Sequence, residues 1–169
     1  MPLDVTRQLL LNELQGLYET ENQMSGALPR MAQLATVPSI RQALEGHLEA
    51  TCHQVLRLGR VLADLGETVG RGTTRTLSRL IDEGGRLALA TGSSRVLNRE
   101  LVKLVRYVEQ FEIASCGCAI SYADLLGYRQ VSEVLRMMMQ EKEANDRRLA
   151  EQVIEMPLAA VGRDWGWLA

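Results

Sequence analysis

The sequence has few aromatic residues and no long apolar run. Among 169 residues there are two tryptophans, four tyrosines and one phenylalanine. A core built mostly from Leu, Val, Ile, Met and Ala is typical of packed helices. No apolar stretch approaches the roughly 18 residues that span a bilayer, and the start "MPLDVTRQ" lacks the charged, apolar and small-residue order of a secretion signal. We therefore expect no membrane association.

An excess of charge of either sign is also missing. Lys and Arg number 19, Asp and Glu number 21, and the net charge is −2. This balance gives no electrostatic reason to expect nucleic acid as a partner. Three cysteines, an odd number without a secretion signal, indicate reduced thiols and a cytoplasmic protein.

Helical periodicity runs through almost the whole chain. Apolar residues recur in steps of four and three, which is the stripe of a packed amphipathic helix. The stripes cover residues 10–35 and 44–65, a third helix runs from Ser93 or Ser94 to about Leu126, and a fourth from about Arg129 to Met156. The length suits one domain. The sequence predicts an all-α four-helix bundle over residues 1–156.

Two segments depart from the four long helices. The connection after residue 66 begins as a loop and continues as a short amphipathic helix. The apolar face of this fifth helix is formed by Leu77, Leu80, Ile81 and Leu87. The tail, residues 157–169, holds Trp165 and Trp167, which are large apolar groups to leave in water. It could dock on its own bundle, on a second subunit or on another protein.

Carboxylates fall where the helices should be apolar. In "VEQFEIASCG" (108–117), Glu109 and Glu112 share the inward face of the third helix with Cys116. Glu21 is in the middle of the first stripe, and Glu141 and Lys142 lie on the inner face of the fourth helix. On the second helix His47 and Gln54 lie about 60–80° from the centre of the apolar stripe, whereas Glu49 and His53 should face water.

These groups also agree in height along the bundle. Residues 21 and 51 are equidistant from the first turn, and residues 112 and 141 are equidistant from the last. Glu21, His47, Glu109, Glu112 and Glu141 should therefore form one layer. Because buried carboxylates are costly and raise one another's pKa, the layer needs metal ions, protons or a lysine to balance it.

At these residues the chain resembles the YciE/YciF-type family of ferritin-like bacterial stress proteins. The resemblance covers nearly the whole chain up to about residue 150. The segments that carry it are "LYETENQ" (17–23), "ALPRMAQLAT" (27–36), "HLEATCHQVLRL" (47–58), "LIDE" (80–83), "VEQFEIASCG" (108–117) and "LLGYRQVSEVL" (125–135). It implies a ferritin-like bundle with one long crossover that carries the short fifth helix, and commonly a homodimer.

Related bundles hold two metal ions between carboxylates and histidines of four helices. The resemblance therefore implies candidate or vestigial ligands for iron or manganese, with Cys116 as a possible thiol ligand or redox partner. The candidate ligands are Glu21, His47, Glu109, Glu112 and Glu141.

Departures from the family pattern fall in the same layer. Ala50 replaces a glutamate, and Lys142 stands where the family usually has a second glutamate after Glu141. Phe111 and Cys116 replace tyrosines, and Gln110 replaces a histidine.

An ammonium in this layer would repel a dimetal centre. We therefore predict a degenerate metal site with Lys142 as internal counter-ion, in which case no cofactor is bound; without that degeneracy, iron or manganese is expected. The alternative for Lys142 is that its flexible stem carries the charge out to water. Whether the protein is an enzyme stays open. The alternatives are a di-iron or dimanganese protein with oxidase, peroxidase or ferroxidase activity, and an interaction module that uses its tryptophan tail.

Overall fold

The computed structural model describes residues 3–69, 79, 82, 86, 90 and 94–154. The long helices are α1 (Leu3–Leu34), α2 (Pro38–Asp64), α4 (Ser94–Leu126) and α5 (Arg129–Ile154). The described ranges contain no strand, so the predicted all-α class is confirmed. The predicted fifth helix, apart from single helical positions at 79, 82, 86 and 90, and the tail with Trp165 and Trp167 lie outside the described residues.

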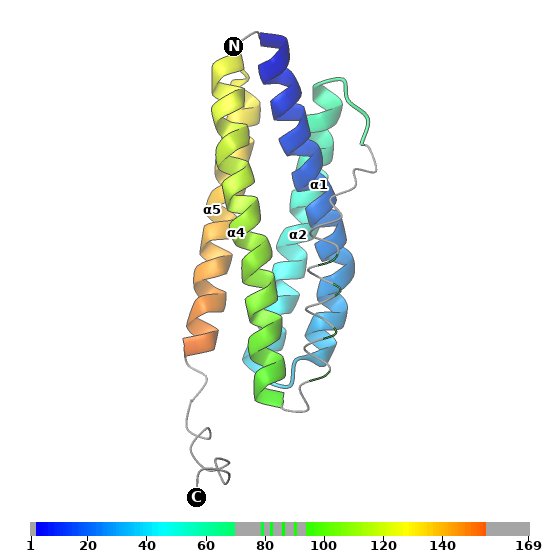
Figure 1. Cartoon of the computed structure of the whole chain (residues 1–169), viewed down its shortest axis with the longest axis vertical. Helices are drawn as coiled ribbons and strands as arrows, with labels where there is room; N and C mark the ends of the chain where they lie inside the picture. Colours follow the sequence, from blue (N-terminus) through cyan, green and yellow to red (C-terminus); the bar gives the residue numbers. More distant parts are fainter. Residues whose placement is uncertain are drawn as a thin grey trace, which may run out of the picture.

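Each long helix is antiparallel to the neighbours on which it packs (Figure 1). α1 packs mainly on α2 and α4, and α5 packs on α4 and, less extensively, on α2. α2 and α4 run in the same direction, so the end of α2 and the start of α4 lie at opposite ends of the bundle (Figure 1). This placement of the two ends is the one that the predicted long crossover requires.

Glycines end two of the long helices, and short turns join α1 to α2 and α4 to α5. Gly66 after α2 and Gly127 between α4 and α5 have positive φ values of 78° and 71°, which favours glycine at the end of a helix. The side chain of Asn98 on α4 accepts hydrogen bonds from the backbone N–H groups of Thr36 (3.1 Å) and Val37 (3.3 Å). The start of α4 is thereby tied to the α1–α2 turn.

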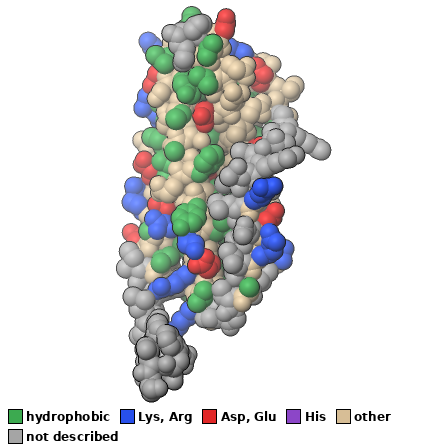
Figure 2. Space-filling view, viewed as in Figure 1, with side chains coloured by type: hydrophobic (Ala, Val, Ile, Leu, Met, Phe, Trp, Pro, Cys, Tyr) green, Lys and Arg blue, Asp and Glu red, His purple; other side chains and the backbone are tan. Residues whose placement is uncertain are grey.

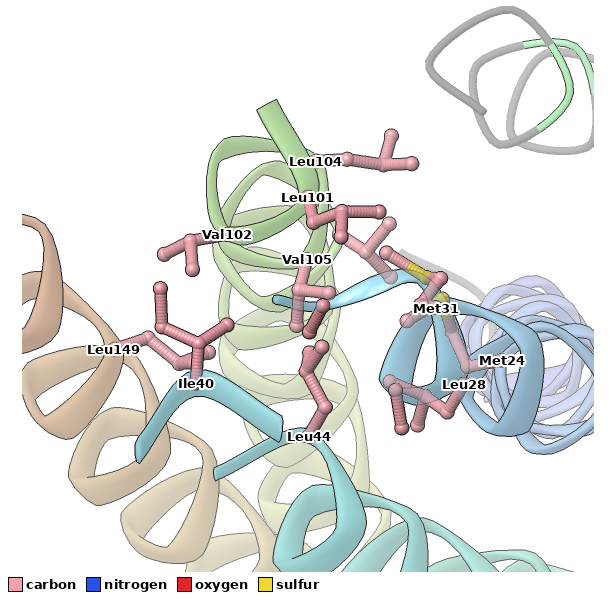
Figure 3. Close-up of a cluster of buried hydrophobic side chains, with 13 residues drawn as sticks. Met24, Leu28, Met31, Ile40, Leu44, Leu101, Val102, Leu104, Val105 and Leu149 are labelled. Carbon is pink, nitrogen blue, oxygen red and sulfur yellow. The ribbon is translucent and has the colours of Figure 1, made fainter. Parts of the chain in front are cut away.

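The interior consists of two apolar clusters. The first apolar cluster, drawn in Figure 3, contains Met24, Leu28, Met31, Ala32, Ala35, Ile40, Leu44, Leu101, Val102, Leu104, Val105, Val108 and Leu149. The second apolar cluster contains Leu10, Leu14, Leu17, Leu58, Val61, Leu62, Cys116, Ala119, Ile120, Ala123, Val131, Leu135 and Met138. Every helix contributes to both, so each cluster joins all four.

Between these clusters, buried polar side chains form a layer across the bundle. We call it the polar layer, and its members are Glu21, His47, Thr51, Gln54, Glu109, Glu112 and Lys142. On each helix the sequence passes from one apolar cluster through this layer to the other. The outer surface mixes both signs of charge on the face shown in Figure 2.

Candidate functional site: the polar layer

Lys142 of α5 lies at the centre of the polar layer, with a side chain that is 0 % exposed. Its Nζ forms an ion pair with the carboxylate of Glu21 on α1. It lies 2.8 Å from Oε2 of Glu112 on α4 and donates a hydrogen bond to Oε1 of Gln54 on α2 at 3.1 Å. A single ammonium therefore binds side chains from the other three helices.

Helical spacing explains why these groups meet. On α1, Glu21 is four residues after Leu17 and three before Met24, both buried apolar residues, so all three lie on one face. On α5, Lys142 is likewise four residues after the buried Met138. The same stripes that build the apolar clusters therefore carry the charged groups inward.

A second contact in the layer joins His47 of α2 to Glu109 of α4. His47 Nδ1 lies 3.1 Å from Glu109 Oε1, and both side chains are at least 95 % buried, with exposures of 5 % and 1 %. Glu109 Oε2 is 4.0 Å from the Lys142 ammonium. Neither His47 Nδ1 nor either carboxyl oxygen of Glu109 has a well-aligned hydrogen-bond partner among the described residues. This half of the layer is thus less completely paired than the half around Lys142.

Burial changes the acidity of every charged group in the layer. It raises the pKa of Glu109 to about 8, although the Lys142 ammonium opposes the change. Burial likewise raises the pKa of Glu21 and, more strongly, of Glu112. Burial also lowers the pKa of His47 to about 3, with the Lys142 charge acting in the same direction. At neutral pH, Glu109 is therefore mainly protonated and His47 is neutral.

For Lys142 the neighbouring carboxylates outweigh burial. Burial alone would lower its pKa, but Glu112, Glu21 and Glu109 together raise it. The ammonium is therefore retained, because a cation among carboxyl groups is more stable than a neutral amine there. Charge balance then comes from one ammonium together with protons held by carboxyl groups.

Glu141 lies at the edge of the layer rather than at its centre. Its side chain is 34 % exposed and its carboxylate accepts hydrogen bonds from Arg57 Nη1 at 2.7 and 2.8 Å. Gln54 Nε2 also donates to it, at 3.0 Å. Burial would raise the pKa of Glu141, but these hydrogen bonds outweigh it and lower the pKa. Glu141 therefore joins the layer only through Gln54.

Cys116 is buried in the second apolar cluster. Burial raises the pKa of its thiol to about 12, although the Lys142 charge opposes this. At neutral pH the group is a thiol, whereas metal ligation and redox chemistry need the thiolate. The other two cysteines, Cys52 and Cys118, are exposed and free.

The structure brings together most of the residues that the sequence indicated. Glu21, His47, Glu109, Glu112 and Lys142 share one layer, and Glu49 and His53 face outward as expected. The central position of Gln54 was underestimated, because the buried face of α2 is rotated toward His47 and Gln54 and leaves Leu48 and Val55 half-buried. A signal for this position was present in the sequence. Polar residues recur at 47, 51 and 54, in the same steps of four and three as the apolar stripes.

These residues do not fit a dimetal centre. Oε1 of Glu21 and Oε2 of Glu112 are bound to the Lys142 ammonium, and Glu141 is held by Arg57. A metal ion between them would lie beside a fixed positive charge. Within the described residues, no three His, Cys, Asp or Glu side chains are arranged to hold a metal ion.

Comparison with known proteins finds relatives that match nearly the whole chain. A family model described as a domain of unknown function (DUF892) matches residues 5–158. Protein YciF of Escherichia coli (strain K12) is 27% identical over 155 residues, which cover 91% of this chain and 93% of YciF. The resemblance to YciE/YciF-type proteins is thereby confirmed.

Solved structures agree with this assignment. YcfI of Rhodopseudomonas palustris, described as a candidate structural protein, is 32% identical, with a TM-score of 0.81, over 86% of this chain and 92% of its own. The E. coli stress protein YciF gives a TM-score of 0.82 at 27% identity, over 88% and 94% of the two chains. A Xanthomonas campestris protein at 20% identity and a TM-score of 0.69, over 88% and 90%, shares the fold. None of the described helices is both long and apolar enough to cross a bilayer.

Proposed function

The chain belongs to the DUF892 family, and we propose that it is a stress-associated bundle protein in which Lys142 replaces a dimetal centre. The similarity to the E. coli stress protein YciF supports the stress role. The name of the R. palustris relative supports a structural rather than a catalytic role. On this proposal, the polar layer holds four helices together and carries out no reaction.

The observation that carries the proposal is the fully buried Lys142 ammonium between Glu21 and Glu112. These two carboxylates belong to α4, which packs directly on α5, and to α1, which lies across the bundle from α5. A buried carboxylate needs a cation or a proton. Lys142 supplies the cation from within the chain, so folding alone completes the layer.

Metal analysis of protein purified without chelators tests the proposal. We expect substoichiometric iron and manganese in the natural sequence, before and after incubation with Fe(II) or Mn(II). The double substitution Ala50→Glu/Lys142→Glu removes the ammonium and adds two carboxylates to the region of the layer. It should bind metal measurably by calorimetry and elemental analysis.

Lys142→Met is the matched control, because it removes the ammonium without adding a ligand. It should not gain metal. The competing function is a redox enzyme with iron or manganese held by Glu21, His47, Glu109, Glu112 and Glu141. Roughly stoichiometric metal in the natural protein, lost on Glu112→Gln, would establish that alternative and overturn the proposal. A double variant that folds and stays metal-free would contradict the idea that Lys142 replaces a metal.

A further inference from the structure

A groove between α4 and the last turn of α5 lies beside the point where α5 ends. Its volume is about 400 Å³, and its lining includes Arg99, Lys103, Arg106, Tyr107, Gln110 and Val153. Val153 directly precedes Ile154, the last residue of α5. The end of α5 and the start of α4 lie at the same end of the bundle (Figure 1). The chain that follows Ile154 therefore leaves the bundle next to this groove.

Arg106 is held in the groove by α5. Its Nε and Nη2 atoms donate hydrogen bonds to Oδ1 and Oδ2 of Asp146, at 2.7 and 3.2 Å, and Gln110 Nε2 donates to Oδ2 at 2.9 Å. Hydrogen bonds of this kind lie in the plane of the guanidinium group and leave its faces for aromatic rings. The side chain of Arg106 is 37 % exposed, and the neighbouring Tyr107 is 54 % exposed. The groove thus presents a fixed cation beside an exposed aromatic ring.

The tail (residues 157–169) has the composition and the length to fill this groove. It holds both tryptophans of the chain, Trp165 and Trp167, and tryptophan is the best aromatic partner of a cation. Trp165 is eleven positions after Ile154, and eleven extended residues reach about 40 Å. The groove follows residues 99–110 of α4, which is about 16 Å of helix. The tail can therefore turn back and lie along it.

We propose that residues 164–167 dock in this groove of their own chain, with the ring of Trp165 stacked on the guanidinium group of Arg106 and in contact with Tyr107. This contact removes apolar surface of both rings from water and adds the attraction between the cation and the indole. The tail thereby ties the end of α5 to α4 across the outside of the Arg106–Asp146 ion pair.

Charge at the rim of the groove favours the same arrangement. Asp164 is the sole acidic residue among residues 158–169 and directly precedes Trp165. A ring stacked on the groove therefore brings this carboxylate near Lys103. The side chain of Lys103 is 50 % exposed and already pairs with Glu100 on its own helix, so a second carboxylate can approach it from the solvent side.

Tryptophan fluorescence is the first test, because both tryptophans of the chain belong to the tail. Trp167→Phe leaves Trp165 as the single reporter. Its emission should be shifted to shorter wavelength relative to the urea-unfolded chain, and acrylamide should quench it several-fold less. Trp165→Phe leaves Trp167 as the reporter, which should be quenched more strongly than Trp165, since the stacked ring is the one that the groove shields.

Substitutions in the groove test the location. In the Trp167→Phe background, Lys103→Glu/Tyr107→Glu removes the ring and repels Asp164. It should raise acrylamide quenching of Trp165 toward that of the unfolded chain, with unchanged helical content by circular dichroism. The matched control is Met137→Glu, because Met137 is 45 % exposed and lines a different groove, between α5 and the end of α2. It should leave the quenching unchanged.

Disulfide trapping tests whether the tail binds its own chain. In a Cys52→Ser/Cys118→Ser background, Lys103→Cys and Gly166→Cys place two thiols at the groove, within the short separation that a disulfide needs. Mild oxidation should give a crosslink within one chain, seen as a faster band of single-chain mass on a non-reducing gel. The pair Met137→Cys and Gly166→Cys is the control and should crosslink far less.

Three results would overturn the inference. They are equal quenching of Trp165 in the folded and unfolded chains, shielding that Lys103→Glu/Tyr107→Glu leaves intact, and a crosslink that forms only between two chains. The first would mean that Trp165 does not dock on the bundle, and the second that it docks elsewhere. The third would mean that the groove takes the tail of a second copy.

Discussion

The apolar clusters and the polar layer stabilise the same four helices in different ways. In the first apolar cluster, side chains such as Leu28 and Leu44 are fully buried among other apolar groups, and each contributes through the apolar surface that it removes from water. In the polar layer, burial by itself is unfavourable for every charged member. Lys142, Glu21 and Glu112 are stable there only as a set.

The two regions should therefore differ in how substitutions combine. Apolar side chains of similar size can replace one another at modest cost, and distant ones contribute independently. Groups that share a buried ion pair do not contribute independently, because removal of one leaves the others unpaired. The apolar clusters hold the bundle together, and we infer that the polar layer in addition fixes which residues of each helix meet.

The largest expected effect is that of Lys142→Met, which preserves much of the side-chain volume but removes the ammonium. Glu21 and Glu112 would then lie buried without a cation. Removal of one partner from a buried ion pair costs about 3–5 kcal/mol. Urea denaturation at pH 7 should show the free energy of unfolding reduced by an amount in this range.

Leu28→Ala in the first apolar cluster provides the comparison, with an expected cost of about 2–5 kcal/mol. Adding Glu21→Gln and Glu112→Gln should recover much of the loss in Lys142→Met but none of the loss in Leu28→Ala. If the two glutamine substitutions restored the free energy of unfolding equally in Lys142→Met and in Leu28→Ala, the polar layer and the apolar cluster would not differ in the way inferred here.

Sequence patterns predicted the four long helices and the common height of the buried carboxylates. The four-and-three spacing located the helices, and Gly127 ends α4 where predicted. Equal distances from the turns placed Glu21 and Glu112 at one height. This succeeds because straight antiparallel helices convert sequence position into height and face.

Side-chain contacts were harder to predict. Lys142 has a flexible stem that could equally have reached water, and only the buried carboxylates explain why it points inward. Glu141 is on the predicted part of α5, yet Arg57 draws it toward the surface. A small rotation of α2, invisible in a pattern of apolar residues, brought Gln54 between Lys142 and Glu141. Periodicity gives the face of a helix, but not the torsion angles that choose among several charged partners.

A smaller effect concerns pH. The pKa of Glu109 is raised in the folded state from 4.5 to about 8, so its contribution to stability is present below pH 4.5 and is lost as the pH rises toward 8. The pKa of His47 is lowered from 6.5 to about 3, so its contribution is present above pH 6.5 and is lost as the pH falls toward 3. The two slopes oppose each other between pH 4.5 and 6.5. The free energy of unfolding should therefore decrease between pH 6.5 and 8.

Glu109→Gln removes the titrating carboxyl group and should make that decrease shallower in urea denaturation at a series of pH values. Because Glu21 and Glu112 also have raised pKa values, part of the decrease should persist. Leu28→Ala should lower the whole curve and leave its slope unchanged. A slope that is the same in Glu109→Gln as in the natural protein would contradict the protonated state assigned to Glu109.

The smallest effect is expected at the edge of the polar layer, where Arg57 and Glu141 are 30 % and 34 % exposed. Arg57→Ala should lower the free energy of unfolding by no more than about 1 kcal/mol, because solvent screens such a pair. Added salt should shrink this loss but leave that of Lys142→Met nearly unchanged, since screening acts mainly on exposed charges. Urea denaturation at low and high salt measures both. If Arg57→Ala cost as much as Lys142→Met, the interdependence of the layer would extend through Gln54 to the surface, and Glu141 would belong with the buried groups after all.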